Sequence, residues 1–218
     1  MSLENLKTAQ PGQTPNPVYA RPASDEQIER TVAALGQRGI QAFVVSDGVA
    51  VKAKLEELIP AGAEVFTSSS ATLRQLGLLD ELDQEGHFNG LRARLGKMDP
   101  KTQNREMQKL GATPEFIVGS VQAVTETGSV LVASATGSQL APYAAAAAHV
   151  VWVVGSQKIV PTLDEAIQRL EEYAFQLEDQ RAMNAYGRHS GINKVLLVNK
   201  EANPERTRMI IVKENLGF

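Results

Sequence analysis

The sequence predicts a single α/β domain built on a mostly parallel sheet with helices on both faces. Strand-like and helix-like segments alternate along one continuous stretch, which is typical of α/β folds. The segment 150–154, Val-Val-Trp-Val-Val, is apolar on both faces, as expected of a central strand covered by helices. Hydrophobic residues make up 43% and charged residues 22% of the 218 residues, so the chain can bury a core of its own.

Residues 1–23 are predicted to form a flexible proline-rich leader and residues 24–218 the folded domain. Prolines recur between residues 10 and 22, and each restricts its own φ and disfavours helix in the residue before it. Periodic sequence begins at about Ser24, and no internal repeat or second domain is visible.

The first half of the domain is expected to alternate helix and strand. Ser24 or Asp25 caps a helix that ends at Gly39, with Ile28, Val32 and Leu35 on one face. The following expected elements are a strand over 40–45, a helix over 48–58, a strand over 63–66 and a helical pattern over 73–79.

The second half begins with surface helices over 80–111, one of them starting at Asp99-Pro100. Strands are expected over 115–119, 129–132 and 150–154, with an Ala-rich helix over 141–148 before the last of these. A helix is expected after Thr162, which is its N-cap, with Glu165 as the partner in a capping box. The buried stripe of this helix runs to Leu177. Segments 194–198 and 208–212 suggest a closing pair of strands.

The composition excludes several classes of protein. A formal charge of 22 − 25 = −3 argues against nucleic-acid binding through a broad basic face. The chain has no Cys, which excludes disulfides, thiolate zinc sites and Cys-ligated iron–sulfur clusters, and its three His lack a metal-site spacing, so no metal or cofactor is predicted. The longest apolar run, 144–154, is too short to span a bilayer, and the first 22 residues lack a signal-peptide core, so a cytoplasmic protein is expected.

Polar segments that follow predicted strands supply the candidate site. Small and hydroxyl-bearing residues there can donate to an anion, and ligands bind at the carboxyl ends of parallel strands. Each residue also has a simpler explanation: the serines as helix caps, Glu126 as an exposed turn residue, Lys158 as a solvated side chain and His189 as a surface residue. The candidate residues are Ser68, Ser69, Ser70, Thr72, Glu126, Thr127, Gly128, Thr136, Gly137, Ser138 and Lys158.

Several segments together resemble the LUD domain, the lactate-utilisation family. They are 66–73 (FTSSSATL), 119–128 (GSVQAVTETG), 135–138 (ATGS), 153–160 (VVGSQKIV) and 212–218 (VKENLGF). The resemblance implies the α/β fold shared with sugar-phosphate isomerases (NagB and RpiA type) and CoA transferases. It also implies an association with lactate oxidation beside iron–sulfur partner proteins. Related members carry a Cys-rich segment where this chain has 184–193 (NAYGRHSGIN), so this chain would need a partner for electron transfer.

The leading hypothesis is a protein that binds a small anionic ligand, namely a hydroxy or keto acid or a phosphorylated or CoA-linked compound. The serine cluster and the 136–138 segment would donate to the anion, Lys158 would balance charge, and Glu126 would be the reactive or orienting carboxylate.

Two alternatives stay open. One is an isomerase or CoA-transferase-like enzyme that uses Glu126 as base or nucleophile, by fold analogy. The other is a non-catalytic accessory subunit of an iron–sulfur lactate-oxidising complex. Exposed edge strands and the Ala-rich segment also allow a homo-oligomer.

Overall fold

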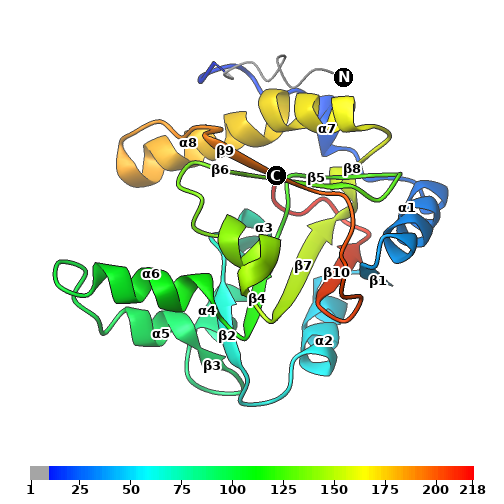
Figure 1. The fold of residues 1–218 in the computed structure, drawn as a ribbon. Coiled ribbons are helices and arrows are strands. Elements are labelled where there is room, and N and C mark those ends of the chain that lie inside the picture. The colour runs from blue at the N-terminus through cyan, green and yellow to red at the C-terminus, as the bar shows by residue number, and fades with distance from the viewer. Residues whose placement is uncertain (1–9) are drawn as a thin grey trace.

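The structure is a computed structural model that describes residues 10–218, so positions 1–9 of the expected leader lie outside the described residues. Its centre is a six-stranded parallel sheet in the order β1-β10-β7-β4-β2-β3 (Figure 1). The predicted α/β class with a mostly parallel sheet is confirmed. The strands are β1 (Gln41–Val45), β10 (Thr207–Val212), β7 (His149–Gly155), β4 (Phe116–Gly119), β2 (Glu64–Thr67) and β3 (Asn89–Gly90).

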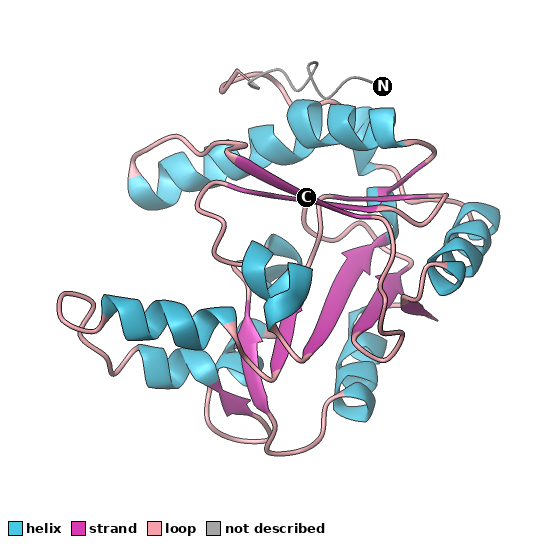
Figure 2. Ribbon diagram, in the orientation of Figure 1, coloured by secondary structure: helices cyan, strands magenta, loops and turns pink. Residues whose placement is uncertain are grey.

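A second, four-stranded sheet lies above the first and was not predicted. Its order is β8-β5-β6-β9, in which β5 and β8 are parallel and the other two pairs are antiparallel. Figure 2 shows it nearly edge-on between the long upper helix and the larger sheet. Its strands are β8 (Ile159–Val160), β5 (Ala123–Thr125), β6 (Val130–Ser134) and β9 (Lys194–Val198).

Helices cover both sheets. The long upper helix consists of α7 (Leu163–Arg169) and α8 (Phe175–Tyr186), joined by a π-helical turn at Leu170–Ala174. Around and beneath the sheets lie α1 (Asp25–Gln37), α2 (Gly48–Leu58), α3 (Ala71–Gln75), α4 (Leu79–Asp83), α5 (Leu91–Leu95) and α6 (Asn104–Ala112). None of the helices within residues 10–218 is long and apolar enough to cross a membrane.

The core is divided by β7, the strand predicted to be central. Val150, Trp152 and Val154 face a cluster shared with α1 and the small sheet. Val151 and Val153 face the opposite cluster, which includes side chains of α2, α3 and α4. A third cluster lies between the small sheet and the long upper helix. Because successive strand residues point to opposite faces, a continuous apolar run is what this two-sided burial requires.

The predicted helix caps are confirmed at two positions. Ser24 Oγ accepts from Gln27 N while Gln27 accepts from Ser24 N, a full capping box, and α1 follows it. Thr162 Oγ1 accepts from Glu165 N at the start of α7. The predicted second helix has the same bounds as α2, which Asp47 caps through Ala50 N.

The predicted closing pair of strands is wrong. β9 pairs with β6 in the small sheet, whereas β10 inserts between β1 and β7 in the large one. Both segments were correctly identified as strands, but alternation of apolar residues gives no information on a strand's partner.

Three local predictions also need correction. The 73–79 helical pattern is broken into α3 and α4 by Gly77, whose φ is +68°. The Ala-rich segment forms only a short π-helical turn, Pro142–Ala146. Asp99 caps a turn by accepting from Lys101 N and Thr102 Oγ1, and α6 begins only at Asn104. Asp and Ser/Thr-type side chains favour such turns as readily as helix starts.

Residues 10–23 lie along the long upper helix (Figure 1). Asn16 N donates to Glu172 O at 2.9 Å, and its side chain donates to the Glu172 carboxylate at 2.8 Å. Gln176, 1% exposed, accepts from Gln13 N and donates to Gln10 O. A short 3₁₀ turn, Pro17–Ala20, completes this packing.

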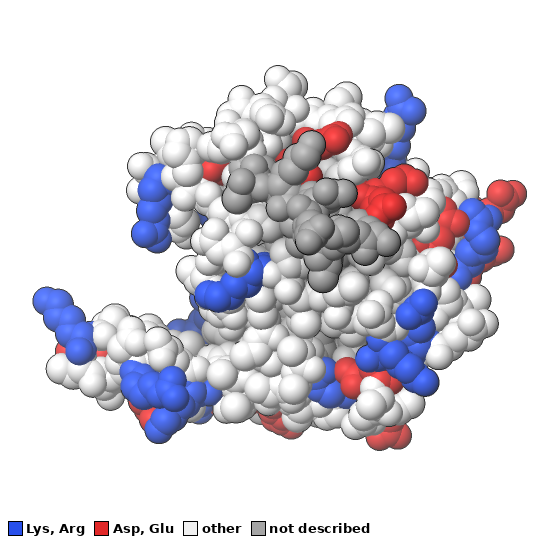
Figure 3. Space-filling view, turned by 45° about the horizontal axis from the view of Figure 1, so that its top comes forward, with Lys and Arg blue, Asp and Glu red and all other residues white. Residues whose placement is uncertain are grey.

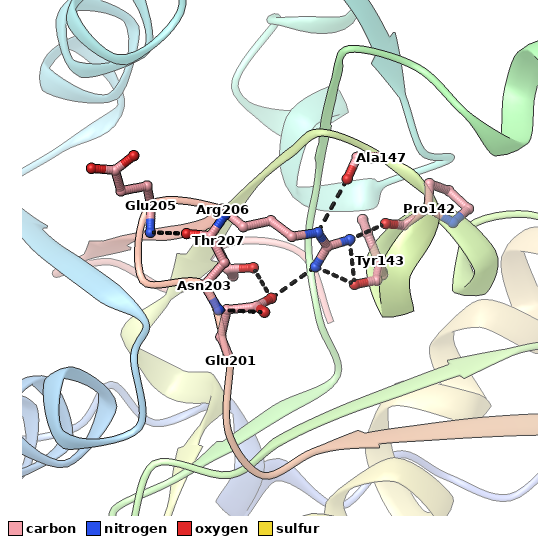
Figure 4. A network of polar contacts seen from close by, with 8 residues as sticks. All are labelled: Pro142, Tyr143, Ala147, Glu201, Asn203, Glu205, Arg206 and Thr207. Atoms are coloured by element: carbon pink, nitrogen blue, oxygen red, sulfur yellow. Dashed lines mark hydrogen bonds and ion pairs between the residues drawn. The ribbon is translucent and has the colours of Figure 1, made fainter.

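Arg206, 9% exposed, ties the β9–β10 connection to the turn that precedes β7 (Figure 4). Its guanidinium donates to the carbonyl oxygens of Pro142, Tyr143 and Ala147 and forms a 2.8 Å ion pair with Glu201. Pro142 O also accepts from Ala147 N at 3.3 Å, and the Arg206 guanidinium adds a donor to each of the three carbonyl groups.

Candidate functional site

A cavity of about 540 Å³ lies among α8, the start of α3, the segment after β6 and the loop 186–193. Ser68 follows β2, Ser120 follows β4, and Lys158 comes shortly after β7, and all three line it. These three strands are neighbours in the parallel sheet, so their carboxyl ends reach the same edge. The cavity therefore occupies the position where open α/β sheets bind ligands.

Lys158 is the most deeply buried basic group of this lining, with 1% exposure. Its Nζ lies 3.0 Å from Thr72 Oγ1 and 3.1 Å from Ser120 Oγ. Thr72 in turn donates to Leu216 O at 3.2 Å. The simpler explanation that Lys158 is a solvated side chain is therefore wrong.

Burial lowers the pKa of Lys158 well below its usual value, and the nearby charge of Arg169 lowers that pKa further. Arg169 is itself fully buried, and burial lowers its pKa to about 10. It donates to Gln157 O and Gln122 O, while its Nη2 has no hydrogen-bond partner among residues 10–218. Neither group is ion-paired with a described carboxylate, so the charge of Arg169 has no counter-charge among residues 10–218.

The serine cluster combines structural and exposed hydroxyls. Ser68 is buried and its Oγ lies 2.9 Å from Tyr143 Oη, whose pKa burial raises. Gly119 permits this contact, because a Cβ there would overlap both hydroxyls. Ser70 caps α3 by accepting from Leu73 N at 3.2 Å, which is the simpler explanation considered above. All four candidates of this segment, Ser68, Ser69, Ser70 and Thr72, line the cavity.

The segment after β6 supplies the opposite wall. Thr136 and Ser138 line the cavity, whereas Gly137 does not. Gly137 instead allows the turn, with φ +88° and its N donating to Ser134 Oγ at 2.8 Å. Lys194 fixes this segment by donating to Thr136 O at 2.7 Å.

Most charged side chains of the lining are basic. They are Arg74, Arg181 and Arg188 besides Lys158, while Glu178, which pairs with Arg181 at 2.7 Å, is the only acidic side chain of the lining among the described residues. Arg181 and Arg188 both approach the ring of Tyr186, at 5.4 and 5.9 Å from its centroid. Figure 3 shows Lys and Arg around the hollow between the upper part of the molecule and the projecting α5–α6 pair.

Asp179 holds the loop that borders the cavity. It is 3% exposed and accepts from Ser190 N at 2.8 Å and from His189 Nδ1 at 2.9 Å. A carboxylate only accepts hydrogen bonds, so Nδ1 is the donor in this contact. His189 was expected to be a surface residue; its side chain is 60% exposed, and it also lines the cavity.

Replacing Asp179 with Ala is expected to loosen this loop and to weaken ligand binding about tenfold. The change leaves Ser190 N–H and His189 without their acceptor, a loss of about 1–3 kcal/mol locally. Amide hydrogen exchange of 187–193 and calorimetric titration would measure the two effects. Asp164→Ala, on the exposed side of α7, is the matched control and should change neither.

Glu126, Thr127 and Gly128 lie away from the cavity, in the turn between β5 and β6. Glu126 accepts from Gln27 Nε2 at 2.8 Å and pairs with Arg30 at 2.8 Å. Burial raises the pKa of Glu126, but the bonds from Gln27 and Arg30 outweigh it, and the net pKa is lowered. The expectation that Glu126 would converge with the serines is wrong, because the turn packs on α1, where Gly128 fits closely against Ala34.

Glu126→Gln is therefore expected to leave ligand affinity unchanged while costing up to about 1 kcal/mol of stability, since Arg30 is mostly exposed. Calorimetric titration and thermal melting would measure both. A loss of affinity as large as that of the Asp179 variant would show that the turn takes part in the site.

Several residues of this site were not identified from the sequence. Ser120 directly follows β4, and a search of every strand end would have found it. Asp179 lies between Phe175 and Ala182 on the buried face of α8, so a charge in an apolar stripe was the available signal. Arg74 and Arg181 neither follow a strand directly nor interrupt an apolar stripe, so the sequence gives no indication of their place in the site. Within residues 10–218, no cluster of three or more potential metal ligands occurs.

Comparison with known proteins finds one matching family model. The family model described as LUD domain matches residues 28–212. A solved structure of a DUF162 family protein from Deinococcus radiodurans aligns with a TM-score of 0.54 at 14% identity, over 88% of this chain and 99% of that one. The eIF2B beta structure from Chaetomium thermophilum aligns with a TM-score of 0.35 at 16% identity, over 64% and 48% of the two chains. No curated protein matches the chain.

Proposed function

Because this chain belongs to the LUD domain family, we propose that it serves lactate utilisation by binding a small anionic metabolite in the cavity beside Lys158. The preferred ligands are hydroxy and keto acids, and phosphorylated or CoA-linked compounds share the same anionic chemistry. The observation that carries the proposal is an excess of cations over carboxylates in and beside one hydroxyl-lined cavity at the sheet edge.

The charge balance supports an anion. Lys158 and Arg169 are both buried and lack a described carboxylate partner, and the charge of Arg169 disfavours the protonated form of Lys158. An uncompensated buried cation costs free energy, and a bound anion would offset that cost for Arg169 and favour a proton on Lys158. Arg74 and Arg188 add charge that remains exposed to solvent.

The hydroxyls support a ligand with several oxygens. Ser69, Thr136 and Ser138 are exposed members of the lining, and Ser120 is partly exposed. Hydroxyls both donate and accept, so they suit a ligand that combines a carboxylate with a hydroxyl or carbonyl oxygen. The proposed binding set is thus Ser68, Ser69, Ser70, Thr72, Ser120, Thr136, Ser138 and Lys158.

Calorimetric titration with lactate, pyruvate, phosphate and acetyl-CoA tests the proposal. We expect saturable binding of at least one, weakened about tenfold in an Arg181→Gln, Arg188→Gln double variant, since each exposed charge contributes about 1 kcal/mol or less. Arg105→Gln, on the exposed face of α6, is the control. Absence of binding to all four compounds, or equal affinity of wild type and double variant, would refute the proposed site.

A further inference from the structure

The Lys158 amine has a hydrogen-bond arrangement suited to a nucleophile. Its two described contacts are both hydroxyl oxygens, Thr72 Oγ1 and Ser120 Oγ. The Thr72 hydroxyl can donate its proton to Leu216 O at 3.2 Å or to Ser120 Oγ at 3.3 Å, and in both cases its oxygen accepts from the amine. A neutral amine has two N–H groups and one lone pair. With both N–H groups donated to hydroxyls, the lone pair is the group left free.

The surroundings favour the neutral form of this amine. Burial and the positive charge of Arg169 both lower the Lys158 pKa, and no described carboxylate restores it. A buried lysine with a lowered pKa is the form in which lysine acts as a nucleophile toward carbonyl groups. The closing segment holds this arrangement in place: Gly217, with φ +64°, lies against Thr72 so closely that a Cβ would overlap Thr72 Oγ1.

We propose that Lys158 captures the carbonyl carbon of a 2-keto acid as a reversible imine. This inference rests on the proposed function, since the cavity must first bind the acid as an anion. The amine nitrogen forms a bond to the carbonyl carbon, and one amine proton passes to the carbonyl oxygen to give a carbinolamine. That oxygen then takes a second proton and leaves as water, while the remaining C–N bond becomes C=N.

The two hydroxyls have defined parts in this step. Ser120 Oγ, 3.1 Å from the amine, accepts an amine proton and donates its own to the departing oxygen. Thr72 is a positioning residue, because its hydroxyl is fixed between Lys158 and Leu216 O. The step needs no oxidant or reductant, and the imine draws electrons from the carbon beside it.

Reductive trapping tests the inference. The full-length protein is incubated with pyruvate and then with sodium borohydride, and the digested peptides are analysed by mass spectrometry. We expect a reduced pyruvate adduct on Lys158 and at least tenfold less on exposed lysines such as Lys97 and Lys101. Lactate has no carbonyl group and should give no adduct, but should compete with pyruvate.

Two variants of Lys158 test whether its amine, and not only its charge, is needed for the adduct. Lys158→Arg keeps a cation but has no amine that can form an imine, so it should give no adduct. Lys158→Met removes the amine and should give none either, and thermal melting shows that both variants are folded. Equal labelling of Lys158 and the surface lysines, or no label at Lys158, would overturn the imine.

Calorimetric titration distinguishes a protein that forms no imine from one that does not bind the acid at all. Pyruvate and lactate that bind without any adduct would refute the imine and leave anion binding intact. Absence of both binding and adduct would refute the two together for these acids.

Discussion

Replacing Arg206 with Ala is expected to lower the free energy of unfolding by about 3–5 kcal/mol, which corresponds to a melting temperature about 10 °C lower. The change removes the guanidinium donor from the carbonyl oxygens of Pro142, Tyr143 and Ala147, and it leaves Glu201 without its ion-pair partner. Glu201 is 14% exposed in its side chain, so water replaces the guanidinium poorly.

The same variant should alter the acid dependence of stability. Burial raises the pKa of Glu201, but bonds from Arg206 and Thr207 outweigh it and leave the pKa below its ordinary value. A lowered carboxyl pKa stabilises the fold above the unfolded pKa, and this contribution is lost as the pH falls through the folded pKa. Without Arg206 the contribution shrinks. Thermal melting across acidic pH would measure it.

Glu205→Ala is the matched control, because Glu205 is exposed and joins this network only through its backbone N–H. Its melting temperature should stay within about 1 °C of wild type. If the Arg206 variant had the same melting temperature as this control, the structural role assigned to the guanidinium would be contradicted.

Replacing Lys158 with Met is expected to raise stability and to reduce ligand affinity at least tenfold. The thioether side chain fills a similar volume without a group that must lose its proton on burial. Affinity falls because a hydrogen bond to a charged ligand group contributes about 1.5–3 kcal/mol. Stability and binding therefore change in opposite directions, as is common where a site holds an unfavourable group.

The lowered pKa of Lys158 also predicts the direction in which the stability of the protein changes with pH. The folded pKa of Lys158 lies well below its ordinary value, so between the folded and unfolded pKa values the unfolded chain binds a proton that the folded chain has released. Stability of the wild type therefore rises with pH between the folded and unfolded pKa values. The Met variant should lack this component of the slope. Lys101→Met, on an exposed turn, should keep it, and thermal melts from neutral to alkaline pH would decide.

Local signals in the sequence were enough to predict most elements. Ser24, Asp47 and Thr162 each satisfy an N–H at the start of a helix, and such short-range bonds depend only on nearby residues. The two-sided burial of β7 was likewise predictable from its continuous apolar run. By contrast, β8 is two residues long and β5 three, which is too short for any periodic pattern.

The site was only partly predictable, because its contacts join distant segments. Hydroxyls after predicted strands pointed to the correct sheet edge, and Ser68, Thr72 and Thr136 do line one cavity. The burial of Lys158 depends on α3 and on the closing segment, which its own neighbours in sequence cannot indicate. Glu126 was misplaced for the same reason: its position is set by Gln27 and Arg30 of α1.

A crystal structure of the protein grown with lactate or pyruvate would test the central claim most directly. We expect the acid in the cavity, with its oxygens within hydrogen-bond distance of Lys158 Nζ and of hydroxyls from the 68–72 and 134–138 segments. An acid bound elsewhere, such as at the Glu126 turn, with the cavity left to water, would contradict the account.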